Sequence, residues 1–369
     1  MTSTRTRSTK QTTKAWRYFI ISEHIKKYKP GGKGNKMEKE LNNQPLKDPE
    51  TEKNDALRER AAENVEQFFC FIDKIQSDAY KPIKTGLNFY DELTGGARPQ
   101  TLTILLAAQK AGKSMLFAQL AEALALQHAR HIVYLNFEMS REQLLARAIS
   151  ARIKKRGNIQ KSMTDILEGY KWNDAERREI LAAIDEYKMD SLPYISYNPE
   201  GIQPTVENIE AYLKELEETP APPHLFVDYL QLIQGEKHED IKDRLTHVLI
   251  MLKDYAVKAN ASVFLISAVN RNSKEHITAS SARDTSSIEY QADALLSLEM
   301  YKDQEIAERK GLARMELKLL NTRFGESDRH AILYRDGRNN LFYGEYKGKY
   351  NEDLPEWLDD QDDNAIDIN

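Results

Sequence analysis

The stretch LLAAQKAGKSML, residues 105–116, restricts the possible folds of this chain more than any other. The preceding segment, residues 85–108, predicts a helical turn before a Gly-Gly pair and then an apolar strand that ends at the stretch. After it, residues 115–127 carry apolar side chains three and four positions apart, which predicts a helix. This order of strand, loop and helix is the context that a phosphate-binding loop requires. The alternative is a chance Gly-Lys-Ser sequence in a surface turn.

The first position of the loop is Ala107, where the usual motif has glycine. Alanine lacks the freedom of glycine at positive φ, so it fits only if the backbone stays near the strand region. Backbone N–H groups of such a loop and of the following helix surround the phosphates of a nucleotide, lysine adds a positive charge, and serine ligates Mg²⁺. We therefore expect ATP and Mg²⁺ as cofactors, held by Ala107, Ala108, Gln109, Lys110, Ala111, Gly112, Lys113, Ser114 and Met115.

Two carboxylates follow apolar strands and are candidates for the same site. Asp228 ends the apolar run of LFVDY and is expected to hold Mg²⁺ through water, together with Ser114. Glu138 follows the strand HIVYLNF, and an acid there can activate or position water for hydrolysis beside Lys113. The alternatives are a turn-forming or helix-capping role for Asp228 and a helix-capping role for Glu138.

Apolar segments recur along the chain with helical segments between them. Strands are predicted at residues 131–137, 224–233, 262–269, 292–300 and 315–323, and helices at residues 141–155, 172–188 and 240–259. Such alternation predicts a mostly parallel sheet covered on both faces by helices. Asp336-Gly337, between two alternating runs, predicts a closing β-hairpin over residues 331–344. The fold class is therefore α/β.

The ends of the chain differ from this core in composition. Residues 1–36 carry ten Lys and Arg against one acid, Glu23, and are predicted to form a basic flexible arm, unless Met37 is the true start. Residues 37–79 are predicted to form a helical linker and packing segment, and residues 351–369 an acidic disordered tail. The net charge of -5 leaves nucleic-acid binding to a local patch.

The single cysteine, Cys70, cannot form an internal disulfide and is expected to be buried and inert. No apolar run approaches the ~18 residues that a membrane span needs. An apolar signal-peptide core is also missing after the basic residues at the N-terminus. We therefore expect a cytoplasmic protein without a membrane partner.

Several segments together resemble one known family. The stretches NFEMSREQLLARAIS, FVDYLQLI, ISAVNRNS, SSIEYQADALLSLE and NTRFG are similar, in order and at plausible spacing, to successive motifs of the ATPase domain of DnaB-type ring-shaped replicative helicases. The similarity extends from about Pro82 to Gly344. It implies a RecA-like ATPase domain, placed at residues 80–350, that assembles as a homo-oligomeric ring, expected to be a hexamer.

The resemblance also implies roles and partners. Nucleotide would lie between subunits, single-stranded DNA would pass through the centre, and a primase or helicase loader is a possible partner. By position in the motifs, Lys113 and Glu138 would be catalytic, and Arg323 would be the arginine finger that reaches the γ-phosphate of a neighbouring subunit. A solvated arginine at a strand end is the alternative for Arg323.

The chain departs from the family pattern at three positions in the ATPase domain. Ala268 occupies the place of a γ-phosphate-sensing glutamine, and Asn321 replaces a lysine two positions before Arg323. The phosphate loop is one residue shorter than the commonest form.

The family's N-terminal collar of about a hundred residues has no counterpart in the chain. Either the arm and the helix near Val65 replace it, or the protein relies on partners, or ring formation is weak.

The polar segment of residues 270–287 occupies the position from which the family directs loops into the central channel. The candidate contacts to DNA phosphates are Arg271, Lys274, Arg283 and Ser286, and the alternative is a merely solvated loop.

The leading function is an ATP-dependent DNA helicase that translocates on single-stranded DNA in replication. A RecA-like recombination mediator or replication regulator without unwinding is the second, and a catalytically silent subunit is the third.

Overall fold

The computed structural model describes residues 49–76, 80–127, 130–235, 240–269, 277–281, 287–301, 304, 307 and 311–346. The chain divides into two units, residues 1–77 and residues 78–369. The described part of the first unit is one helix, α2 (Pro49–Ile75), which lies inside the segment predicted to be helical. None of the described side chains of α2 is buried.

The expectation that Cys70 is buried is wrong. Cys70 lies on α2 and its side chain is exposed. A single helix cannot bury a side chain by itself, and the described part of this unit contains no second element to cover Cys70.

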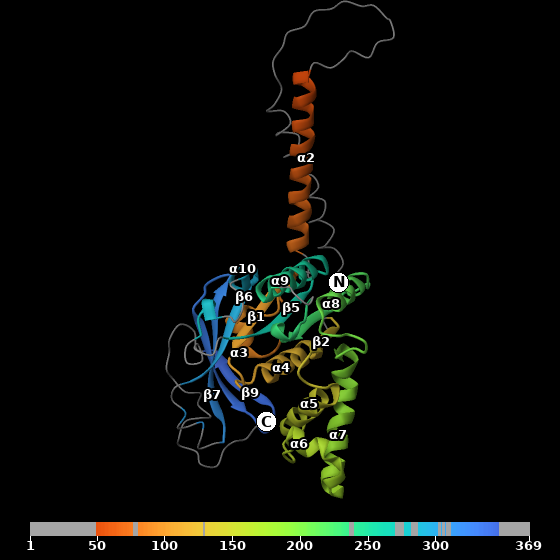
Figure 1. Ribbon diagram of the computed structural model, residues 1–369, viewed down its shortest axis with the longest axis vertical. Helices are drawn as coiled ribbons and strands as arrows, with labels where there is room; N and C mark the ends of the chain where they lie inside the picture. Colours follow the sequence, from red (N-terminus) through yellow and green to blue (C-terminus); the bar gives the residue numbers. More distant parts are fainter. Residues whose placement is uncertain are drawn as a thin grey trace, which may run out of the picture. The chain divides into compact units, whose positions relative to one another are not determined.

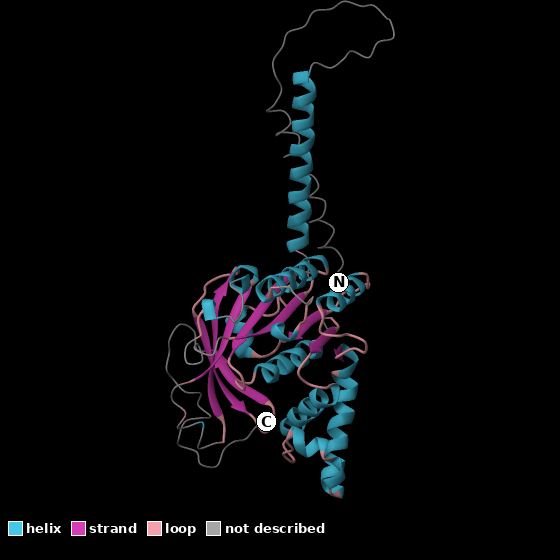
Figure 2. Cartoon of the chain, viewed as in Figure 1, coloured by secondary structure: helices cyan, strands magenta, loops and turns pink. Residues whose placement is uncertain are grey.

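The second unit is built on one sheet, whose strands are magenta in Figure 2. The sheet has nine strands in the order β3-β2-β4-β5-β1-β6-β7-β8-β9. The strands are β1 (Thr101–Ala107), β2 (Ile132–Asn136), β3 (Ile195–Tyr197), β4 (His224–Asp228), β5 (Ser262–Ala268), β6 (Ala294–Met300), β7 (Ala313–Thr322), β8 (Arg329–Asp336) and β9 (Leu341–Tyr346). Pairing is parallel from β3 to β6 and antiparallel from β6 to β9. The predicted mostly parallel sheet and the closing hairpin are confirmed.

Helices cover both faces of this sheet (Figure 1). They are α3 (Asn88–Thr94), α4 (Lys113–Leu126), α5 (Arg141–Arg156), α6 (Met163–Leu167), α7 (Asp174–Asp190), α8 (Val206–Glu217), α9 (Ile241–Lys258) and α10 (Ser287–Gln291). Alternate residues of β1 enter two apolar clusters: Leu105 packs with residues of α3, α4, α5 and α7, whereas Ile104 packs with residues of α8 and α9. Because successive side chains of a strand point to opposite faces, the two clusters lie on opposite sides of the sheet.

The strand predicted over residues 224–233 ends earlier than expected. Strand β4 stops at Asp228, and residues Leu230–Leu232 form a short 3₁₀ helix. Leu230 and Ile233 are both fully buried, three residues apart. This spacing suits a helical turn, so the apolar run that predicted a longer strand is divided between two kinds of structure.

Strand β1 lies at the centre of the sheet, between β5 and β6. The carboxyl ends of β1, β2, β4 and β5 are on the same edge because these strands are parallel. In open parallel sheets this edge is the usual place of a ligand site. The described helices include none that is both long and apolar enough to cross a bilayer.

Candidate nucleotide-binding site

The predicted phosphate loop connects β1 to α4 at the carboxyl edge of the sheet. Ala107 is the last residue of β1 and pairs with Ala268, so alanine is in extended backbone there and glycine is unnecessary. Positive φ angles occur later in the loop, at Lys110 (64°) and Gly112 (100°). No side chain caps the N-terminus of α4. The backbone N–H groups of its first turn are therefore available to an anion.

Lys113, the first residue of α4, folds back over the loop. Its Nζ donates a hydrogen bond to the carbonyl oxygen of Ala108 at 3.2 Å and lies 6.0 Å from the ring centroid of Tyr229. Burial lowers the pKa of the Lys113 ammonium, while the negative charges of Asp228 and Glu138 raise it. Lys113 is thus a partly desolvated cation whose nearest anionic influences are the two predicted carboxylates.

Asp228 ends β4 and is fully buried. Its Oδ2 accepts hydrogen bonds from Asn136 Nδ2 at 2.8 Å and from the Tyr134 hydroxyl at 3.4 Å. Oδ1 has no hydrogen-bond partner within the described part of the chain. Burial raises the pKa of Asp228, and the nearby Ser114 and Lys113 side chains lower it.

These surroundings fit a hard divalent cation. A buried carboxylate oxygen without a partner, close to the Ser114 hydroxyl, provides the oxygen donors that Mg²⁺ prefers. Clusters of three or more His, Cys, Asp or Glu side chains suited to a metal are absent from the described residues. Mg²⁺ in nucleotide sites commonly uses one or two protein ligands together with phosphate and water, so the small number of donors agrees with this use.

Glu138 follows β2, next to the strand that carries Asp228. Its side chain is exposed at the carboxyl edge, and its charge influences both Lys113 and Asp228. Lys113, Ser114, Glu138 and Asp228 therefore converge at one edge of the sheet, although they are spread over more than one hundred residues of sequence.

Asn136 links the Asp228 carboxylate to the backbone turn that carries Glu138, and the sequence analysis did not predict this role. Its Nδ2 bonds Asp228, and its Oδ1 accepts hydrogen bonds from the backbone N–H groups of Glu138 at 2.9 Å and Met139 at 2.7 Å. Asn198 supports the same turn, because its Oδ1 accepts from the Asn136 N–H and its Nδ2 donates to the Met139 carbonyl. The sequence signal that could have indicated this role is a polar residue within a predicted apolar strand, two positions before Glu138.

Two further side chains near the site were also missed. Arg147 on α5 lowers the pKa of Asp228, and its buried Nε has no hydrogen-bond partner in the described part of the chain. Gln231 donates from Nε2 to the Ser267 hydroxyl at 2.9 Å, and its Oε1 accepts from the Ala268 N–H at 3.1 Å. An amide side chain thus contacts the end of β5, where Ala268 itself offers only a methyl group.

Arg323 lies at the opposite edge of the sheet. It follows Thr322, which pairs with Ala294, and Ala294 pairs with Thr103 near the start of β1. From Thr103 to Ala107 alone, β1 spans about 13 Å. Arg323 Nη2 donates to the Tyr290 carbonyl at 2.8 Å, and Nη1 lies 3.5 Å from Asp293 Oδ1. Arg323 is therefore remote from the predicted phosphate loop of the same chain.

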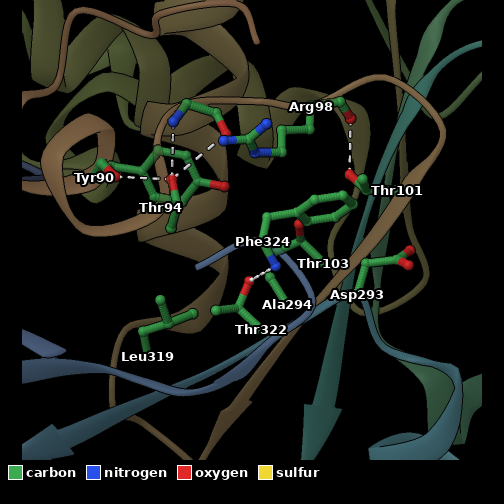
Figure 3. A pocket seen from close by; sticks show the side chains of 11 residues that line it. Tyr90, Thr94, Arg98, Thr101, Thr103, Asp293, Ala294, Leu319, Thr322 and Phe324 are labelled. Atoms are coloured by element: carbon green, nitrogen blue, oxygen red, sulfur yellow. Dashed lines mark hydrogen bonds between the residues drawn. The ribbon is translucent and has the colours of Figure 1, made fainter. Parts of the chain in front are cut away.

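A small pocket adjoins this edge, lined among others by Tyr90, Arg98, Thr322 and Phe324 (Figure 3). The guanidinium carbon of Arg98 lies 5.0 Å from the ring centroid of Phe324, the residue after Arg323. This edge thus presents cationic and aromatic side chains. The predicted DNA contacts Arg271, Lys274, Arg283 and Ser286 lie outside the described residues.

Comparison with known proteins gives a consistent result. A family model described as "DnaB-like helicase C terminal domain" matches residues 82–341. The replicative DNA helicase DnaB of Leifsonia xyli subsp. xyli is 26% identical over 289 residues, which cover 76% of this chain and 58% of that protein. The replicative DNA helicase DnaC of Bacillus subtilis is 27% identical over 233 residues, which cover 60% and 48%. The chain thus spans about half the length of the curated relatives it matches.

Solved structures share the fold. A DnaB-like replicative helicase, described with its interactions with primase, superposes with a TM-score of 0.60 at 17% identity and covers 75% of this chain and 65% of its own. An isolated ATPase domain superposes with a TM-score of 0.61 at 18% identity, over 75% of this chain and 96% of that domain. The nine-stranded sheet is therefore a RecA-like core of the kind found in these ATPase domains.

Proposed function

The chain belongs to the family of DnaB-like helicase C-terminal domains, and from this premise we propose that it is an ATP-dependent DNA helicase. It translocates on single-stranded DNA and unwinds duplex DNA in replication, as a cytoplasmic protein. The observation that carries the proposal is the convergence of Lys113, Glu138 and Asp228 beside the phosphate loop. The naming of the curated relatives as replicative helicases favours this function over a mediator that does not unwind.

Each residue of the site has a separate task in hydrolysis. The N–H groups at the start of α4 and the Lys113 ammonium bind the phosphates. Ser114 and Asp228 hold Mg²⁺, which neutralises charge on the phosphates when bound. Glu138 accepts a proton from the attacking water or orients it. Asn136 fixes the position of Glu138 relative to Asp228 through its three hydrogen bonds.

Arg323 acts in trans in this proposal. Its place at the edge opposite the phosphate loop supports a contact with the nucleotide of a neighbouring copy rather than its own. The active form is then a ring of identical subunits, six by analogy with the family, and hydrolysis depends on assembly. Arg271, Lys274, Arg283 and Ser286 are proposed to contact the DNA strand.

Strand displacement on a forked DNA substrate tests the proposal. With ATP and Mg²⁺ the unmodified chain should displace the strand, and Lys113→Ala should abolish displacement because the phosphates lose their main cation. Lys214→Ala, on the exposed face of α8, is the matched control and should leave the rate unchanged. Hydrolysis of ATP without displacement, with or without a loader, would instead support the mediator function.

A further inference from the structure

The C-terminal hairpin places a second cation against the phosphate loop. Arg335, near the end of β8, donates a hydrogen bond from Nη1 to the Lys110 carbonyl at 2.6 Å. A Cβ atom added at Gly112 would lie 3.1 Å from Arg335 Cδ and 2.9 Å from Phe342 Cζ. The loop is therefore in direct contact with side chains that come from more than 220 residues later in the chain.

Arg335 has no anionic partner within the part of the chain that the structure describes. No carboxylate of these residues lies within ion-pair distance of its guanidinium, and the side chain is half-buried. Burial lowers the pKa of Arg335, yet a guanidinium remains charged at neutral pH. A partly desolvated charge without a counterion is unfavourable unless an anion binds there.

The hairpin is held firmly at this position. Gln119 of α4 donates to the Phe342 carbonyl at 2.9 Å and accepts from the Phe342 N–H at 2.8 Å, so β9 runs beside α4 (Figure 1). In the hairpin loop, Asn340 Nδ2 lies 3.3 Å from the Ser150 hydroxyl of α5. These contacts tie Arg335 to the same helices that frame the candidate nucleotide site.

We propose that Arg335 binds the polyphosphate of the nucleotide in its own subunit, as a second cation beside Lys113. This inference rests on the proposed function of the phosphate loop. A phosphate in the loop would lie close enough to the guanidinium for charge-assisted hydrogen bonds to form. Arg335 would then donate to a phosphate oxygen in place of the Lys110 carbonyl, or would donate to both. The hairpin thereby becomes part of the nucleotide site.

Two substitutions separate the charge of Arg335 from its contact with the loop. Arg335→Gln keeps an N–H donor for the Lys110 carbonyl but removes the charge, whereas Arg335→Lys keeps the charge. Binding of a fluorescent ATP analogue with Mg²⁺ should weaken about tenfold in the glutamine variant and much less in the lysine variant. The dissociation constant of the glutamine variant should also depend less steeply on KCl concentration. Arg338→Gln, in the exposed turn of the same hairpin, should bind as the unmodified chain does.

Chemical modification gives a second readout on the unmodified chain. MgATP should protect Arg335 from phenylglyoxal, measured by mass spectrometry, and should leave Arg338 as reactive as before. Equal affinity of the glutamine variant and the unmodified chain would overturn the proposal, and so would equal weakening by glutamine and lysine or labelling of Arg335 unaffected by MgATP. Failure of the unmodified chain to bind nucleotide at all would instead refute the proposed function.

Discussion

Asn136 illustrates how a single neutral side chain can organise a charged site. It donates to the Asp228 carboxylate and accepts from two backbone N–H groups in the turn that carries Glu138. The amide of asparagine is suited to this because it has both donors and acceptors on one short, rigid group. The distance between the proposed metal-binding carboxylate and the proposed base is thus set by a residue that itself takes no proton.

Replacing Asn136 with alanine should therefore damage hydrolysis more than nucleotide binding. The change leaves two backbone donors without a partner and removes the shorter of the two hydrogen bonds to Asp228 Oδ2. It should lower the free energy of unfolding by about 1–3 kcal/mol. We expect kcat for ATP hydrolysis to fall at least tenfold, because small misplacements of a catalytic group are costly. Steady-state kinetics and urea unfolding measure the two effects.

Asn208→Ala is the matched control for this prediction. Asn208 also donates a side-chain hydrogen bond, to the Thr205 hydroxyl at 2.9 Å, but on an exposed helix end and to a partner outside the candidate site. It should leave kcat unchanged. A correctly folded Asn136→Ala variant with normal kcat would contradict the positioning role of Asn136.

The charged residues of the site could be predicted from the sequence, whereas the groups that support them could not. Lys113, Ser114, Glu138 and Asp228 stand at the ends of recognisable strands or in a recognisable loop, and the structure brings them together. The supporting roles depend on which strand lies beside which, because the partners of Asn136, Arg147 and Gln231 are distant in sequence. One-dimensional spacing carries no information on such pairings.

At the scale of helices and strands, buried polar contacts hold neighbouring strands in register. His224, the first residue of β4, is fully buried, and its Nδ1 accepts a hydrogen bond from the Ser262 N–H of β5 at 2.9 Å. Burial, reinforced by the charge of Arg130, lowers the pKa of His224 to about 3. The neutral ring is therefore part of the folded state, since protonation at Nδ1 would remove the acceptor.

The pH dependence of stability follows from this shift. A histidine whose pKa is lower in the folded state stabilises the protein above its unfolded pKa of about 6.5, and that contribution is lost as the pH falls toward 3. We expect His224 to account for a loss of roughly 2 kcal/mol in the free energy of unfolding between pH 7.5 and pH 5. Urea unfolding at both pH values measures it.

Two histidine variants isolate the contribution of His224. His224→Asn removes the titrating group and should make the free energy of unfolding less dependent on pH over this interval, even if its absolute stability is lower. His247→Asn, at an exposed position on α9, should keep the pH dependence of the unmodified chain. An unchanged pH dependence in His224→Asn would show that other groups cause the acid sensitivity.

The predictability of helices and strands depended on their length and burial. Central strands such as β1 and β5 are long apolar runs, buried on both faces, and were predicted within a few residues. Strand β3 has three residues, too few to show a periodic pattern, and it was missed. The short 3₁₀ helix after Asp228 was predicted as strand because its leucines, Leu230 and Leu232, continue the apolar run.

At the scale of the whole molecule, the sheet separates two edges that have different proposed roles. The phosphate loop lies at the carboxyl ends of the parallel strands, and Arg323 lies at the other end of β1 and β6. One copy of the chain therefore carries the proposed phosphate loop at one edge and the proposed arginine finger at the other. A closed ring of copies with head-to-tail contacts would join these halves at every interface.

Mixing two inactive variants tests this arrangement. Arg323→Ala subunits keep an intact phosphate loop, and Lys113→Ala subunits keep an intact Arg323, so each should be nearly inactive alone. In rings formed from equal amounts, about a quarter of the interfaces combine an intact loop with an intact Arg323 from the neighbour. ATP hydrolysis should recover at these interfaces, whereas mixing Lys113→Ala with Lys113→Ala,Arg323→Ala subunits should give no recovery. Absence of recovery in rings shown by native mass spectrometry to contain both single variants would exclude a trans role for Arg323.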